Sequence, residues 1–165
     1  MLTRYVLPET QKMPSAGKLN CELAGTCLSA LASQALNLAF DYHLIDGRMR
    51  LVLSVLQKLQ DNSVTGVDMH GVEIAFDKDI LSGKFAIANG QVHATYWQLA
   101  VEENQRIFRA FRADSGIFVL DFDEQQERYK GSFSFECFGS VESNSQQVNV
   151  TQGTFEISGR DEFTL

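Results

Sequence analysis

The sequence predicts an all-β protein, an antiparallel sandwich or barrel of about eight to eleven strands. Apolar and polar residues alternate along most of the chain, which is the period of a half-buried strand. Turn-forming pairs such as Asp46-Gly47 and Asn89-Gly90 separate these stretches. Phenylalanine is abundant, with 12 residues, and aromatic side chains favour strands. No rhythm of strands and long helices appears, so a parallel α/β sheet is not expected.

The 165 residues are enough for one domain with a sizeable core. Residues 1–17 contain both prolines and little periodicity, so we expect an N-terminal arm. Residues 18–160 are predicted to form a single β domain. Residues 161–165 are predicted to be a frayed tail.

The first half of the domain opens with a strand over 19–23, in which Leu19, Cys21 and Leu23 alternate with polar residues. Residues 26–36 are ambiguous, because they are rich in helix formers and fit either one short helix or a strand. The Asp46-Gly47 pair predicts a hairpin, since a type I′ turn needs positive φ at both central positions. Further strands are predicted over 36–44, 49–55 (with an extension to 59 left open) and 67–76.

In the second half, Asn89-Gly90 predicts another hairpin. Turns are expected over 102–105 and 114–116, and a charged hairpin loop over 123–130. Gly153 predicts a β-bulge in the last strand. The predicted strands cover 83–88, 92–101, 106–113, 117–122, 131–138 and 148–157.

Four short stretches share a glycine followed by an aromatic or aliphatic strand. They are Gly83-Lys84-Phe85, Ser115-Gly116-Ile117-Phe118, Gly131-Ser132-Phe133-Ser134-Phe135 and Gly153-Thr154-Phe155-Glu156-Ile157. In this order, over roughly residues 80–158, they resemble the pattern of small all-β domains in uncharacterised bacterial lipoproteins. The resemblance implies a β-sandwich-like fold and implies no activity. The leader and lipidation cysteine of such proteins are not present in this sequence.

Charge and cysteine content restrict the classes of partner. The net charge of −7 argues against nucleic acid, because phosphate binding needs clustered Lys and Arg; it fits a solvated surface or a basic protein partner. Cys21, Cys27 and Cys137 are odd in number, which excludes a complete disulfide framework and indicates free thiols in a reducing compartment. No run of about eighteen apolar residues occurs, so no membrane span is predicted. The expected location is the cytoplasm, although an exported chain trimmed of its leader would look the same.

The candidate ligand-binding residues are three arginines and two aromatic residues. Arg106 and Arg112 are predicted to share one strand face and Arg109 the other, and such guanidinium groups bind carboxylate or phosphate by paired hydrogen bonds. Two alternatives remain: the arginines protect an edge strand against aggregation, or they pair across strands with acids such as Asp121 and Asp123. The aromatic candidates for a pocket mouth are Tyr96 and Trp97, together with Tyr129; the alternative for all three is a place in the core.

No cofactor and no metal site is predicted. Asp41 and His43 share a strand face, but no third ligand is spaced to join them. The acidic residues of 121–127 are predicted to be a solubilising hairpin tip, with weak surface calcium binding as the alternative. No GxSxG motif or other nucleophile–base arrangement appears, so the protein is not expected to be an enzyme.

The favoured function is a non-enzymatic binding or interaction module of unidentified ligand. Its partner would be a protein, such as a basic one, or a second copy of the chain in a homodimer. The alternative function is a barrel that encloses a small apolar or acidic ligand, with the strand Arg106–Arg112 at its mouth. An enzyme of unidentified type ranks third.

Overall fold

The computed structural model describes residues 16–23, 26–31, 38–45, 47–58, 67–126, 128–138 and 147–158, the stretches 26–31 and 38–45 by their backbone alone. Within them the chain forms eleven β-strands and no helix. They are β1 (Ala16–Leu23), β2 (Thr26–Leu31), β3 (Leu38–Ile45), β4 (Arg48–Lys58), β5 (Val67–Asp77), β6 (Gly83–Ala86), β7 (Val92–Glu102), β8 (Gln105–Arg112), β9 (Ser115–Asp123), β10 (Arg128–Phe138) and β11 (Gln147–Ser158).

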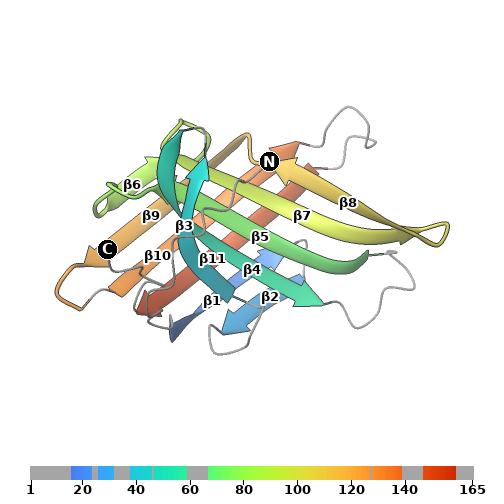
Figure 1. Ribbon diagram of the computed structural model, residues 1–165, viewed down its shortest axis with the longest axis horizontal. Helices are drawn as coiled ribbons and strands as arrows, with labels where there is room; N and C mark the ends of the chain where they lie inside the picture. Colours follow the sequence, from blue (N-terminus) through green and yellow to red (C-terminus); the bar gives the residue numbers. More distant parts are fainter. Residues whose placement is uncertain are drawn as a thin grey trace.

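The strands form two antiparallel sheets that pack face to face as a sandwich. One sheet has the order β2-β1-β11-β10-β9-β6 and the other the order β3-β4-β5-β7-β8. In Figure 1 the sheet of β4, β5, β7 and β8 lies in front, and its strands cross those of β9, β10 and β11 behind it. The all-β antiparallel prediction is confirmed, and of its two architectures the sandwich is correct.

The ambiguous region begins as a strand. Residues 26–31 pair with β1 from Thr26 opposite Leu23 to Leu31 opposite Lys18. The helix considered for 26–36 is therefore wrong over 26–31, because this segment can satisfy its backbone groups by extending the sheet. Residues 32–36 lie outside the described part of the chain.

Two of the predicted turns connect neighbouring strands of the five-stranded sheet. β3 and β4 pair up to Ile45 opposite Arg48, and Gly47 between them has a φ of +76°. β7 and β8 pair up to Glu102 opposite Gln105, and both loop residues have positive φ, +49° at Glu103 and +64° at Asn104. Two-residue loops of this kind match the right-handed twist of the strands that they join.

The hairpin predicted at Asn89-Gly90 is wrong. The chain does turn there, with φ of +71° at Ala88 and +98° at Gly90. However, β6 pairs with β9 in the six-stranded sheet, while β7 belongs to the other sheet. The turn therefore carries the chain from one layer to the other, because a turn-forming pair sets the local path and not the sheet that the next strand joins.

The core lies between the sheets and is built largely from phenylalanine. In β10 and β11 the buried side chains of Phe133, Phe135 and Phe155 alternate with exposed serine, threonine and glutamate residues, as the glycine-phenylalanine pattern predicts. The two layers meet where the ring of Phe76 lies 5.1 Å from that of Phe118, and Phe118 stacks on Phe155 at 5.7 Å.

The last strand contains the predicted bulge. β10 pairs Phe133 with Gly153 but Phe135 with Val150, so β11 has an extra residue between these pairs. Gln152 takes a left-handed conformation at this point, with a φ of +51°. The bulge restores the inward direction of Val150 and Phe155 on either side of it.

We expect that replacement of Gly131 by a residue with a side chain destabilises the fold. This glycine lies opposite Phe155 in β11, and a Cβ atom at this position would be 2.0 Å from the carbonyl oxygen of Val119 and 2.7 Å from the ring of Phe155. Gly131→Ala should lower the free energy of unfolding by about 2–3 kcal/mol, the cost of forcing atoms into a packed core. Urea denaturation measures the change. The neighbouring exposed residue gives the control Ser132→Ala, and equal losses in the two variants would contradict the close approach.

Candidate functional site

The three candidate arginines lie on β8, an edge strand of the five-stranded sheet. The exposed residues Arg106, Phe108 and Arg112 occupy its outer face. Arg109 lies on the inner face with the buried Phe111, so the predicted division of the arginines between two faces is the observed one.

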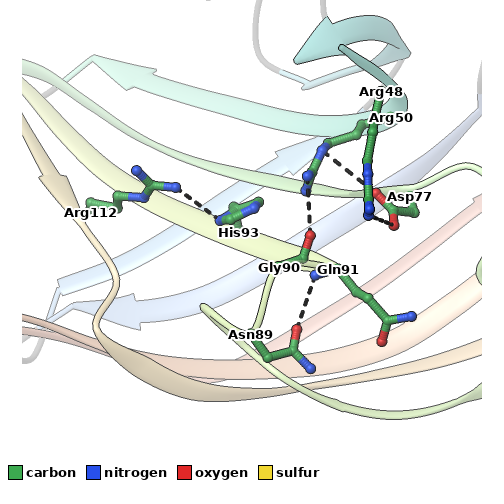
Figure 2. Close-up of polar contacts among 8 residues, drawn as sticks. All are labelled: Arg48, Arg50, Asp77, Asn89, Gly90, Gln91, His93 and Arg112. Carbon is green, nitrogen blue, oxygen red and sulfur yellow. Dashed lines mark hydrogen bonds and ion pairs between the residues drawn. The ribbon is translucent and has the colours of Figure 1, made fainter. Parts of the chain in front are cut away.

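The arginines differ in their contacts. Arg109 forms an ion pair with Glu102, near the β7–β8 turn. Arg112 Nη2 lies 3.2 Å from His93 Nδ1 on the neighbouring strand (Figure 2). Arg106 makes no hydrogen bond or ion pair with another described residue. Asp121 and Asp123 belong to β9 in the other sheet, so the proposed cross-strand pairing with these acids is wrong.

Trp97 extends the outer surface of β8 onto β7. Its ring lies 5.8 Å from that of Phe108, whose side chain is 64% exposed. On the other side the indole lies over Gly71 of β5, where a Cβ atom would be only 2.4 Å from the ring. We call the surface of Trp97, Phe108, Arg106 and Arg112 the arginine–aromatic face.

Tyr96 belongs to the core rather than to this face. Successive strand residues point to opposite sides of a sheet, so Tyr96 faces inward and is 5% exposed, with its ring stacked on Phe111 at 5.9 Å. The structure therefore does not bring Tyr96 and Trp97 together. Tyr129 is also a core residue, stacked on Phe122 at 4.5 Å.

The Tyr96 hydroxyl belongs to a buried hydrogen-bonded chain that fixes the protonation of His70. Nε2 of His70 lies 3.1 Å from Gln57 Oε1, an acceptor, so Nε2 carries the proton. Nδ1 of His70 then accepts from the Tyr96 hydroxyl at 3.2 Å, and that hydroxyl accepts from Gln98 Nε2 at 3.2 Å. All three hydrogen bonds of this chain can form when the imidazole of His70 is neutral. Burial accordingly lowers the pKa of His70 below its usual range.

A second polar group lies on the outer side of β4 and β5, and sequence reasoning missed it (Figure 2). Arg48 Nη1 lies 3.2 Å from Asp77 Oδ2, and Arg50 Nε lies 3.6 Å from Asp77 Oδ1. Arg50 is 3% exposed and donates from Nη2 to the carbonyl oxygen of Gly90 at 3.1 Å. Its Nε and Nη1 and Asp77 Oδ1 make no hydrogen bond with the described residues.

A pocket of about 640 Å³ adjoins this group at the end of the sandwich where the chain crosses between the layers. Its walls come from the start of β4, the end of β5, β6, and the two segments that cross between the layers, 78–82 and 87–91. Lys78 and Met49 join two of these parts by a hydrogen bond between backbone atoms. The residues that line it are Arg48, Met49, Asp77, Lys78, Asp79, Ile80, Leu81, Ser82, Phe85 and Gln91. The sequence contains one signal for this group: the spacing of Arg48 and Arg50 places both on one face of β4 and Met49 on the other face.

The remaining nucleophilic and metal-ligating candidates can be placed within the described ranges. Burial raises the pKa of the Cys137 thiol to about 11, and Sγ donates to the carbonyl oxygen of Phe111 at 3.2 Å, so this thiol is structural. No three His, Cys, Asp or Glu side chains of these ranges are grouped to hold a metal ion. The side chains of Asp41 and His43 lie outside the description. Asp123 Oδ1 accepts from the backbone nitrogens of Gln125 and Gln126, as expected for a hairpin tip.

Fold and surface together define an antiparallel β-sandwich with a basic, aromatic edge and an end pocket. Comparisons with protein-family models, curated proteins and solved structures gave no match. The resemblance to β domains of bacterial lipoproteins therefore stays a prediction. Among the described residues, no helix has the length and apolar character needed to cross a membrane.

The buried His70 predicts a loss of stability on mild acidification. Its folded pKa is lowered, so below about pH 6.5 the unfolded chain binds a proton that the folded chain excludes. The free energy of unfolding should then fall as the pH falls, by at most about 1.4 kcal/mol per pH unit. Urea denaturation between pH 7.5 and pH 5.5 measures the slope against that of His70→Gln, which should be flatter. Ser132→Ala, on the exposed face of β10, is the control and should keep the wild-type slope; an unchanged slope in His70→Gln would refute this origin.

Proposed function

We propose that the protein is a non-enzymatic interaction module that binds an extended, acidic segment of a partner protein along the edge of β8 that pairs with no other described strand. The observation that carries the proposal is the coincidence of an edge strand with exposed aromatic and arginine side chains on the arginine–aromatic face. Strand addition to an open sheet edge is a common mode of peptide recognition.

The backbone of β8 is arranged to accept another strand. The two-residue loop after Glu102 makes Glu102 and Gln105 a hydrogen-bonded pair, and such pairs recur at every second residue. The N–H and C=O groups of Gln105, Ile107 and Arg109 therefore point to β7. Those of Arg106, Phe108 and Ala110 point away from the sheet, where a partner strand would bind them.

Side chains on the outer face supply anchors for such a strand. Phe108 is 64% exposed and packs on Trp97 from one side only. Val101 is also exposed near the same end of the sheet. Large aromatic residues with arginine neighbours are the residue types that dominate the energy of protein interfaces.

The charge of the strand determines the chemistry of its partner. Residues 105–112 include three arginines and no Asp or Glu, within a chain of net charge −7. In a symmetric antiparallel pairing of two copies over residues 106–112, centred on Arg109, Arg106 would lie opposite Arg112 of the other copy, and like charges in that position destabilise a sheet. An acidic segment instead places carboxylates opposite these guanidinium groups. The net negative charge of the chain suggested a basic partner. The charge along this edge is positive, so the proposed partner segment is acidic.

Edge pairing can be tested with a synthetic octapeptide of alternating glutamate and valine. It should protect the amide protons of Arg106, Phe108 and Ala110 from hydrogen exchange and change the emission of Trp97, the single tryptophan. Ala110→Pro removes an outward N–H without removing a hydrogen bond of the sheet, so it should abolish binding while the fold is kept. Phe108→Ser should weaken binding about tenfold through the lost aromatic contact.

The matched controls are Ala110→Ser, which keeps the N–H and should bind normally, and an octapeptide of lysine and valine, which should not bind. Equal binding of the acidic and basic peptides would contradict the charge argument. Normal binding by Ala110→Pro, or no protection of the three outward amides at millimolar peptide, would contradict strand addition itself.

A further inference from the structure

We infer that the pocket at the end of the sandwich binds a small organic anion that has one carboxylate and an apolar chain. This site is separate from the arginine–aromatic face, and the inference does not rest on the function proposed for β8. Its volume of about 640 Å³ lies within the range of small-molecule sites, roughly 300–1,000 Å³.

The two sides of the pocket differ in polarity. Ile80 and Phe85 pack against the core of the sandwich and leave an apolar surface beside Met49. Leu81 extends this surface at the rim, where its side chain is 71% exposed. An exposed leucine next to a concave apolar wall gains from contact with a hydrocarbon chain, because both surfaces then leave water.

The opposite side of the pocket is charged, and its one extra positive charge comes from Arg50, which is not among the lining residues. Arg48 and Lys78 line the pocket with Asp77 and Asp79, and the buried Arg50 lies directly beside Asp77. One carboxylate, Asp77, thus serves two guanidinium groups, and with the buried Arg50 included the group has three cations and two acids. A ligand with a single negative charge balances this group, whereas a cationic ligand adds to the excess.

The contacts of Asp77 show how the anion would be accommodated. Arg48 is 63% exposed along its side chain and can turn from Asp77 toward a ligand carboxylate. Asp77 is then free to move onto Arg50, whose Nε is 3.6 Å from Oδ1 and too distant for a hydrogen bond. Buried donors and acceptors without partners are costly, and this exchange gives Arg50 Nε and Asp77 Oδ1 the hydrogen bond that they lack in the described structure.

Octanoate is the probe for this site, with binding followed by the amide resonances of the ¹⁵N-labelled protein. The expected result is saturable binding with shifts concentrated in residues 78–82, Phe85 and Gln91. Octan-1-ol, which lacks the charge, and octylammonium, which reverses it, should bind at least about tenfold more weakly. Saturable shifts elsewhere, no saturation at millimolar octanoate, or equal binding of the alcohol would overturn the inference.

Variants separate the two halves of the site. Arg48→Gln should weaken octanoate binding about tenfold and Leu81→Ser about fivefold, and both residues are exposed enough for the fold to be kept. The matched control is Arg128→Gln on the other sheet, where Arg128 faces Glu156 at 3.9 Å; it should bind octanoate normally. Wild-type affinity in Arg48→Gln would show that the anion is bound elsewhere. Ala110→Pro should also bind octanoate normally, so failure of the β8 proposal and failure of this one are distinguishable.

Discussion

The fold depends on a line of phenylalanine rings that crosses from one sheet to the other. Phe76 of β5 meets Phe118 of β9 between the layers, and Phe118 continues through Phe155 to Phe133 within the six-stranded sheet. These strands are distant in sequence, so the rings hold together parts of the chain that no local turn connects. Burial of each aromatic side chain contributes more than that of a small aliphatic one, so the contact of Phe76 with Phe118 is a strong link between the layers.

The strands could be predicted from sequence because one face is consistently apolar. Phe133, Phe135 and Phe155 alternate with residues that the structure exposes, and this period is a direct property of an extended backbone. The partner of each strand could not be predicted in the same way. Asn89-Gly90 indicated a turn, but β6 and β7 separate into different sheets because Ile87 and Val92 are both buried in the core from opposite layers.

In the candidate site too, the face on which a residue lies could be predicted, but its neighbour on the next strand could not. Alternation placed Arg106 and Arg112 on one face of β8 and Arg109 on the other, and applied to β7 it also separates Tyr96 from Trp97. The contact between Arg50 and Asp77 could not be predicted from the sequence, because these residues meet only through the register of β4 and β5. Register depends on how the buried faces of two strands fit, and a single strand contains no information on its neighbour.

The pairing of β1 with β11 has a consequence for how the chain acquires its structure. Ala16 lies opposite Ser158, so the central part of the six-stranded sheet joins the two ends of the described chain. A ribosome synthesises β1 and β2 long before β11. During that interval β1 lacks the strand with which it pairs in the folded protein. Contacts so distant in sequence slow folding, since the entropy of closing the intervening loop is lost before the contact forms. A circularly permuted chain, with Ser158 joined to Ala16 by a short linker and new ends in the loop after β8, would make that contact local and should fold faster.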